Sequence, residues 1–421
     1  MYIKKVKIKK VRSIDKFEMS FPKPSGWHVL IGDNGAGKST IIRSVALALI
    51  GSDEITAIKP NWNNWLQWQA DKGSIDLTLS QDVEFDLVNN QNISDEMECN
   101  ITLNRKEGNY VTLDLSPEPE KSVLQMEFWR SRGGWFSAGY GPFRRFTGGS
   151  TDYGSVFENP SFSRLASHLS LFGEDVALTE ATKWLINLQF QTLENKISGN
   201  FLENLKRFIN SSDFLPHDTQ LLNISSEGVT FRDGNGAEIS VTQMSDGYRS
   251  ILSLTFELIR QLVRVYGEDK VFRNIANDEM KIDVPGVVLI DEVDVHLHPT
   301  WQTRIGQWFT HFFPQIQFIV TTHSPLVCRA CGEDGSIWRL TSPGSTIKSG
   351  EITGVDRDKL IFGDILDAYG TDIFGKTAAQ AGKTDEKKEE LGKLNMMAAF
   401  GKISEKDEKT RQELLKVLST Q

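Results

Sequence analysis

The sequence predicts an α/β protein built on a parallel β-sheet, with an antiparallel β subdomain and a helical insert. Apolar strands such as VVLI and QFIVTT alternate with helical stretches, which is typical of a parallel sheet covered by helices on both faces. Short alternating stretches separated by polar turns, between residues 73 and 146, indicate the antiparallel part. Helical periodicity from about residue 150 indicates the insert.

The first half of the chain reads as strands around one helix. Residues 1–31 have the pattern of two or three strands that end in WHVLI, and the first of them alternates apolar residues with lysines in MYIKKVKIKK. A helix with apolar residues on most faces follows over about residues 38–50. The stretches SIDLTLS, CNITLNR and YVTLDLS have the alternation of antiparallel strands. We expect residues 1–150 to form a first lobe.

The second half adds helices and a hairpin. Residues 151–225 include the helical stretch LTEATKWLINLQFQTLENK and are expected to form the insert. VTFRD and AEISV flank the turn Asp233–Gly236, which is a strong hairpin signature. We expect residues 226–350 to form a second lobe, and the charged, helix-prone residues 351–421 to form a C-terminal segment for assembly or partner binding.

Composition limits the class of protein. The 421 residues are 39% hydrophobic with a formal charge of -9, enough for one large or two ordinary domains. No apolar run approaches the roughly 20 residues of a membrane span, and the N-terminus lacks the apolar core of a signal peptide. With only three cysteines, we expect a cytoplasmic protein without a membrane partner. The acidic balance argues against a protein that coats nucleic acid, although it leaves room for a local basic groove.

Two short motifs could suggest metal ligands. Cys328 and Cys331 form a C-x-x-C, but no second cysteine pair completes a four-ligand zinc site. His296 and His298 form an H-x-H for which no third ligand is identifiable. The sequence therefore predicts small buried cysteines and no transition-metal site.

The stretch GDNGAGKST, residues 32–40, fits the phosphate-loop pattern G-x-x-x-x-G-K-[ST] between an apolar strand and a helix. Its glycines allow backbone N–H groups to wrap phosphates, Lys38 reaches the β- and γ-phosphates, and Ser39 can ligate magnesium. A chance glycine turn is the alternative, and the strand and helix on either side argue against it. The predicted ATP-binding residues of this loop are Asn34, Gly35, Ala36, Gly37, Lys38, Ser39 and Thr40.

Two further strands end in residues suited to nucleotide hydrolysis. VVLIDEVD places Asp291 and Glu292 after an apolar strand, where carboxylates are costly without a cation or a polar cleft. We expect Asp291 to serve the metal and Glu292 to orient or deprotonate the attacking water. IVTTHSP places His323 at the end of another strand, which we expect to neighbour the strand before Asp291. His323 would then point at the same crevice and could bond a γ-phosphate. The alternatives are a solvated strand end and a structural histidine.

The triplet Ser245, Asp246 and Gly247 stands before a strongly apolar helical run. The simple interpretation is that Ser245 caps this helix. The order of the motifs, however, resembles the ATP-binding-cassette ATPases, most closely the SMC/RecF/OLD-type branch of AAA-family ATPases. This resemblance covers roughly residues 1–350 and implies an ATPase head that uses ATP and Mg²⁺. It also implies two heads in head-to-tail contact, so that the triplet of one chain binds the ATP held by the other.

The resemblance assigns further residues. Within KKVRSIDKFEMSF, Arg12 and Ser13 match residues that reach the nucleotide. In HLHP this chain has His298 where many relatives have aspartate, which puts the usual cross-dimer contact in doubt. A Q-loop glutamine is not evident. AGYGPFRRF, with Tyr140 and Arg144, stands about where one would lie, and Gln67 and Gln69 are weaker candidates.

A narrower likeness concerns YGPFRR, SLFGEDVALTEATKWL, MSDGYRS, IDEVDVHLHP and LDAYGTDIFG. These stretches resemble compact bacterial ATPases of the Septu anti-phage type, which work with a separate HNH nuclease, sometimes beside a retron. The alternatives are a RecF- or SMC-like repair ATPase that binds DNA or RNA, an ATP-binding scaffold with little turnover, and a transport ATPase. The lack of heptads before Ser245 weakens the SMC alternative. About 70 residues after the core are too few for a fused nuclease domain.

The C-terminal segment carries apolar residues at helical spacing in a charged stretch. They either pack back on their own head or form a docking face for a nuclease or a further ATPase copy, with methionines giving an adaptable surface. The residues concerned are Leu391, Leu394, Met396, Met397, Phe400, Leu414, Leu415 and Leu418.

Overall fold

The computed structural model divides the chain into two compact units, Met1–Phe362 and Gly363–Gln421. It describes residues 1–51, 54–55, 61–86, 96–114, 129, 135–142, 162–173, 179–194, 200–332, 334–342, 344, 348–363, 384–399 and 403–418. In that part of the chain, no helix is long and apolar enough to cross a membrane.

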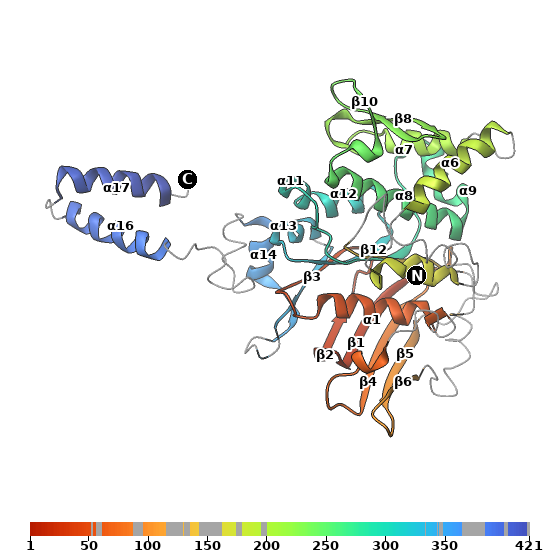
Figure 1. Cartoon of the computed structure of the whole chain (residues 1–421), viewed down its shortest axis with the longest axis horizontal. Coiled ribbons are helices and arrows are strands. Elements are labelled where there is room, and N and C mark those ends of the chain that lie inside the picture. The colour runs from red at the N-terminus through yellow and green to blue at the C-terminus, as the bar shows by residue number, and fades with distance from the viewer. Residues whose placement is uncertain are drawn as a thin grey trace. The chain divides into compact units, whose positions relative to one another are not determined.

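The larger unit is organised by a six-stranded sheet in the order β14-β13-β3-β12-β11-β7 (Figure 1). All neighbours pair in parallel except β14, which is antiparallel to β13. The predicted parallel core is therefore confirmed, as is the expected pairing of the strand before His323 with the strand before Asp291. The strands are β3 (Gly26–Gly32), β7 (Ser137–Tyr140), β11 (Gly286–Ile290), β12 (Ile316–Thr322), β13 (Ser336–Leu340) and β14 (Gly350–Glu351).

A second sheet of five antiparallel strands has the order β2-β1-β4-β5-β6. Alternate apolar residues of its first strand, such as Val6 and Ile8, are buried, whereas Lys9 is exposed. This confirms the predicted antiparallel subdomain for residues 73–80 and 96–114, but the short strand at 137–140 belongs to the parallel sheet. The strands are β1 (Tyr2–Val11), β2 (Ile14–Ser20), β4 (Lys72–Ser80), β5 (Glu96–Arg105) and β6 (Val111–Asp114).

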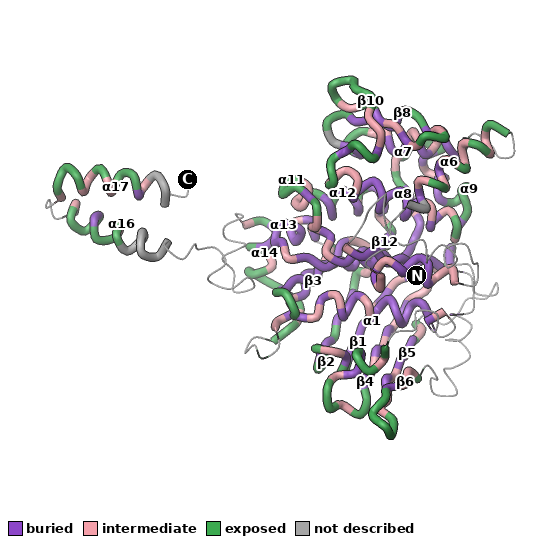
Figure 2. The backbone as a smooth tube through the Cα atoms, in the orientation of Figure 1, coloured by how far each residue is buried: buried purple, intermediate pink, exposed green. Residues whose placement is uncertain are grey.

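Helix α1 (Lys38–Ile50) lies between these two sheets and contacts strands of both (Figure 1). Its position explains why apolar residues occupy most of its faces, since nearly the whole helix is buried (Figure 2). The residues of one large core cluster run from β1 through α1 to β11. Because α1 is held on two sides, its N-terminus is fixed at the edge of the parallel sheet.

A third, three-stranded sheet has the order β10-β9-β8 and packs near α6 and α7. Its β9–β10 pair is the predicted hairpin, closed by backbone bonds across Asp233 and Gly236. Residues 220–225, at the end of the segment expected to be helical, form β8. The elements are α5 (Ser163–His168), η4 (Leu169–Leu171), α6 (Thr179–Leu193), α7 (Asn200–Ile209), η5 (Pro216–Asp218), β8 (Gln220–Ser225), β9 (Gly228–Arg232) and β10 (Glu238–Ser240).

The long helix α8 (Asp246–Tyr266) contacts both α6 and β7, and so joins the three-stranded sheet to the parallel sheet. Most of its length is buried. The remaining helices of this unit are short: η1 (Trp62–Asn64), η6 (Val241–Gln243), α9 (Glu268–Val271), α10 (Arg273–Ala276), α11 (Pro299–Gln302), α12 (Ile305–Phe312), α13 (Pro325–Cys328), η7 (Arg329–Cys331) and α14 (Gly354–Phe362).

In its described residues, the smaller unit contains two helices that contact each other, α16 (Thr384–Ala399) and α17 (Glu405–Leu418). Leu394 and Leu414 are buried in it, whereas the side chains of Met396 and Met397 are 63% and 48% exposed. Phe400 and the side chain of Leu418 lie outside the described part. Helix formation in this segment confirms the prediction from its composition, and its function stays a prediction.

Candidate active site

The site is built where three parallel strands end side by side. β3 leads into the phosphate loop, β11 into Asp291 and Glu292, and β12 into His323. In open α/β sheets, the carboxyl ends of the strands are where ligands bind. A cavity of about 340 Å³ opens at this edge. It is lined by Arg12, Ser13, Asn34, Gly35, Gly37, Lys38, Ser39, Thr40, Glu292 and His323. We call it the phosphate-loop cavity.

The phosphate loop has the backbone that its glycines permit. Gly35 and Gly37 have φ angles of 77° and 98°, which side chains rarely adopt. A Cβ at Gly37 would also clash with Ile14 Cδ1, so a larger residue would strain the backbone and displace that side chain. No side chain caps the start of α1, and its first N–H groups therefore remain available to an anion. Ala36 is buried in the loop and does not line the cavity.

Lys38 reaches three acceptors across the site. Its Nζ donates to the carbonyl oxygens of Gly32 at 2.7 Å and Asp33 at 3.0 Å, and contacts His323 Nδ1 at 3.3 Å. An ammonium group can only donate, so Nδ1 accepts and the remaining proton of a neutral imidazole lies on Nε2. Burial lowers the pKa of Lys38, and the carboxylates of Asp291 and Glu292 oppose that shift. A phosphate oxygen would have to replace one of these three acceptors.

Asp291 and Ser39 provide oxygen ligands suited to magnesium. Asp291 is 1% exposed, and its Oδ1 accepts from Ser39 Oγ at 3.1 Å and from Thr321 Oγ1 at 2.5 Å. Mg²⁺ in nucleotide sites is held through one or two protein oxygens together with water and phosphates. The described residues contain no group of three or more His, Cys, Asp or Glu that could hold a metal. This donor set fits magnesium bound together with a nucleotide.

Glu292 is held at the cavity by its backbone. Its φ is 49°, an uncommon value outside glycine, and its N–H donates to Thr321 Oγ1 at 2.7 Å. The next residue, Val293, donates to the carbonyl of Thr321 at 3.0 Å, and Asp294 accepts from Thr322 Oγ1 at 2.6 Å. These bonds join the loop after β11 to the end of β12. They hold the Glu292 side chain against the same cavity as Lys38.

Arg12 forms a wall of the cavity, supported by a tryptophan that sequence reasoning missed. Its guanidinium lies 4.4 Å from the ring centroid of Trp65, and the backbone N–H of Arg12 donates to the Trp65 carbonyl at 2.8 Å. Burial, and then the charge of Arg43, lower the pKa of Arg12. The run WNNWLQW was the available signal, because cationic side chains often stack on tryptophan. Gln67 and Gln69, the weaker Q-loop candidates, do not line this cavity.

The other Q-loop candidate is only partly described. Tyr140 ends β7, next to β11, and its carbonyl accepts from the N–H of Asp291 at 2.8 Å. Its side chain is fully buried and does not line the phosphate-loop cavity. Arg144 lies outside the described residues. Tyr140 therefore supports Asp291 through its backbone.

The triplet Ser245, Asp246 and Gly247 lies at a different cavity, which we call the signature cavity. Its volume is about 1460 Å³, and it shares no lining residue with the phosphate-loop cavity. α8 begins at Asp246 as predicted, yet Ser245 makes no side-chain cap hydrogen bond. The interpretation of Ser245 as a simple cap is therefore wrong. The loop of His296 and His298 lines this same cavity.

Gly247 packs closely against the histidine loop. A Cβ at this position would lie 3.2 Å from the carbonyl oxygen of His296, which is tighter than an ordinary contact. Asp246 pairs with Arg249 one turn along α8. A glycine at position 247 therefore lets the start of α8 approach the loop that follows Asp291 and Glu292.

Uncommon backbone conformations gather at the two cavities. Among the described residues, ten non-glycines have a positive φ, and six of them line one cavity or the other. Such conformations cost free energy and cluster at functional sites. Those at the phosphate-loop cavity are Arg12 and Glu292, and those at the signature cavity are Asp213, His217, Asp218 and His296.

The fold and the site define the class of protein. A phosphate loop, an Asp-Glu strand end and a histidine strand end share one edge of a parallel sheet, with an antiparallel sheet on the other side of α1 and a Ser-x-Gly helix start elsewhere. This set of motifs resembles the ATP-binding-cassette ATPases of the SMC/RecF type and, within them, the Septu ATPases. The chain belongs to the family described as "AAA domain, putative AbiEii toxin, Type IV TA system", whose model matches residues 28–329.

Two curated relatives and one solved structure are similar to this chain. The Septu protein PtuA of Bacillus mycoides is 27% identical over 78% of the chain and 39% of the relative. The Retron Ec83 probable ATPase of Escherichia coli is 34% identical over 38% of the chain and 29% of the relative. The chain thus spans less than half of either relative. The SMC head domain from Thermotoga maritima has a TM-score of 0.43 and 15% identity, covering 84% of this chain and 99% of that one.

Proposed function

We propose that this chain binds and hydrolyses ATP as a head-to-tail dimer and regulates a separate nuclease in bacterial anti-phage defence. The proposal of a dimer is supported by the separation of the two cavities, which share no lining residue within one chain. The side chain of the exposed Ser245 makes no cap hydrogen bond to its own helix. A second copy that presents this helix start to the phosphate-loop cavity would complete the site.

The chemistry follows from the groups around the phosphate-loop cavity. The uncapped N–H groups of α1 and the ammonium of Lys38 bind phosphate oxygens. Ser39 and Asp291 would hold Mg²⁺, which supplies positive charge to the phosphates. Glu292 orients the attacking water, and the Nε2–H of His323 donates to the terminal phosphate. Ser245 of the second copy adds a hydroxyl and a helix N-terminus.

The defence role rests on the relatives. One is a Septu protein PtuA and another is a probable ATPase of a retron, and the chain spans 39% and 29% of them. For Septu-type ATPases the resemblance implies a separate HNH nuclease. The exposed methionines of the small helical unit are our candidate contact for that nuclease or for a further ATPase copy. DNA or RNA is a candidate trigger of the complex.

The ATPase part is tested by Glu292→Gln. We expect ATP affinity to stay unchanged and turnover to fall by about a hundredfold or more, because a water-orienting carboxylate acts mainly in the transition state. Phosphate release and ATP binding are measured on the same preparation. Glu227→Gln, an exposed glutamate in the turn between β8 and β9, is the matched control and should behave as wild type. Equal turnover in wild type and Glu292→Gln would remove the assignment.

A further inference from the structure

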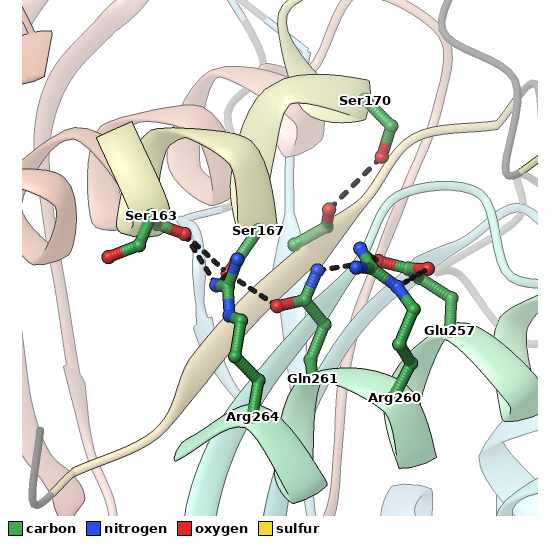
Figure 3. Close-up of polar contacts among 8 residues, drawn as sticks. Ser163, Ser167, Ser170, Glu257, Arg260, Gln261 and Arg264 are labelled. Atoms are coloured by element: carbon green, nitrogen blue, oxygen red, sulfur yellow. Dashed lines mark hydrogen bonds and ion pairs between the residues drawn. The ribbon is translucent and has the colours of Figure 1, made fainter. Parts of the chain in front are cut away.

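The helix that starts at Ser245 carries a polar face near its other end, and two residues of this face, Glu257 and Gln261, are buried. Glu257, Arg260, Gln261 and Arg264 recur at helical spacing on α8, and Gln261 and Arg264 reach toward Ser163 and Ser167 of α5 (Figure 3). Glu257 is only 4% exposed and Gln261 only 1%. Arg260 forms a bidentate pair with Glu257, with bonds of 2.8 and 2.7 Å. Charged side chains are almost never this buried unless they are paired.

The carboxamide of Gln261 joins this pair to the next helix. Its Nε2 donates to Glu257 Oε1 at 2.5 Å, and its Oε1 accepts from Ser167 Oγ at 3.2 Å. Arg264 adds two bonds to α5, to the Ser163 carbonyl at 2.7 Å and to Ser167 Oγ at 2.9 Å. Figure 3 shows these side chains converging between the two helices. α8 is thus fixed to α5 by directional bonds.

The contacts continue from α5 to the edge of the parallel sheet where β11 leads into Asp291. Just after α5, Ser170 Oγ donates to the Gly139 carbonyl at 3.0 Å and accepts from the Gly141 N–H at 3.1 Å. These two glycines flank Tyr140, whose carbonyl accepts from the N–H of Asp291 at 2.8 Å. A continuous set of hydrogen bonds and helix backbone therefore runs from the helix of Ser245 to Asp291.

Stability alone gives little reason for such a network. Buried ion pairs can often be replaced by well-packed apolar residues without loss of stability. Hydrogen bonds, in contrast to apolar contacts, specify one rotation and one height of a helix against its neighbour. α8 is otherwise a largely apolar buried helix. The polar face therefore specifies the rotation and height of this part of α8 against α5.

A further polar group belongs to Tyr140, on the strand next to β11. Its hydroxyl is buried and has no hydrogen-bond partner in the described structure. Burial raises the pKa of Tyr140, and the charge of Glu257 adds to that effect while Arg260 and Arg264 oppose it. The charges of Glu257, Arg260 and Arg264 therefore act on the Tyr140 side chain. A buried donor without a partner costs free energy, and this cost disappears in any state that provides one.

We propose that Glu257, Gln261 and Tyr140 are positioning residues for ATP hydrolysis. Glu257 and Gln261 hold α8 so that Ser245 is presented at the right place, and the Tyr140 hydroxyl gains a partner in this network when α8 shifts against β7 in the ATP-bound dimer. The inference rests on the proposed function. None of the three residues lines the phosphate-loop cavity, so they act through α8 and Asp291.

The test compares Gln261→Met and Tyr140→Phe with wild type. We expect kcat to fall by about tenfold in each, a size typical of residues that couple two sites. ATP affinity should change by less than about twofold, because neither side chain lines the nucleotide cavity. Tyr140→Phe should melt at the same temperature as wild type or higher, since it removes an unpaired buried hydroxyl.

The matched control is Gln317→Met. Gln317 is also fully buried and also makes two hydrogen bonds, to the N–H of Ile3 at 2.7 Å and to its carbonyl at 2.9 Å. It joins β12 to β1, and its hydrogen bonds in the described part of the chain do not involve the network. This variant should lower the melting temperature and leave the kcat of the folded fraction unchanged.

The outcomes separate the inference from the proposed function. Wild-type kcat in both Gln261→Met and Tyr140→Phe, or a loss only in proportion to the unfolded fraction, overturns the inference. If Gln261→Met does not fold, Tyr140→Phe decides alone. If the wild-type protein does not hydrolyse ATP, or if Glu292→Gln hydrolyses it as fast as wild type, the proposed function is overturned instead.

Discussion

The phosphate-loop cavity and the signature cavity differ in how completely one chain satisfies them. At the first, Lys38 and Asp291 are buried and bonded on several sides, and three strand ends supply the groups. At the second, Ser245, Asp246 and His298 are exposed around a cavity four times as large. Under the proposed function, one chain therefore prepares half of a site internally and displays the other half on its surface.

The largest expected difference between the two regions concerns ATP binding. Lys38→Ala should weaken ATP binding by about 2–5 kcal/mol, the usual cost of removing one partner of a buried charge pair. Ser245→Arg should leave the binding of ATP to the isolated head unchanged, because Ser245 lies at the other cavity. Titration with a fluorescent ATP analogue at low protein concentration measures both. Equal losses in the two variants would contradict the division into two half-sites.

A smaller effect is expected at the contact between α8 and the histidine loop. Gly247→Ala places a Cβ 3.2 Å from the His296 carbonyl, so we expect turnover to fall by about tenfold, roughly 1.4 kcal/mol, with ATP binding retained. Gly350→Ala is the matched control, because a Cβ there meets nothing within 4 Å. Steady-state phosphate release gives the comparison. Wild-type turnover in Gly247→Ala would show that this close approach has no part in the site.

The smallest effect on the head is expected from removing the C-terminal unit. Truncation after about Gly375 should leave ATP affinity unchanged and abolish higher assembly or capture of the nuclease, since residues 1–362 form a compact unit by themselves. Nucleotide binding and co-purification of the nuclease are compared between truncated and full-length protein. Loss of folding would favour helices that pack on their own head, and unchanged assembly would remove the docking proposal.

Much of the site could be predicted because its motifs are local. The glycines before Lys38 lie in one short stretch of sequence, and so do the carboxylates that follow the apolar strand. Each motif can therefore be interpreted from the end of a single strand. Gly35 and Gly37 indeed have the positive φ angles that such a loop requires. The expected neighbour of the Asp291 strand was also correct, since alternating strands and helices restrict the order of a parallel sheet.

What could not be predicted depends on tertiary contacts. The strand Ser137–Tyr140 is too short to show a period, and only its pairing with β11 places it in the parallel sheet. The support of Arg12 by Trp65 joins residues 53 positions apart through a ring contact. Likewise, the buried Glu257 interrupts an otherwise apolar run, and only its bonds to Arg260 and Gln261 explain why it is there.

The central claim, a site shared between two chains, is tested most directly by mixing Lys38→Ala with Ser245→Arg. In a mixed dimer, the phosphate-loop cavity of the Ser245→Arg chain meets the intact Ser245 of the Lys38→Ala chain, so one of two sites is complete. Random pairing at equal ratio then restores about a quarter of wild-type turnover from two inactive proteins. Differently tagged subunits verify that mixed dimers form. Turnover no higher than that of either variant alone, at every ratio and with mixed dimers present, would contradict the shared site.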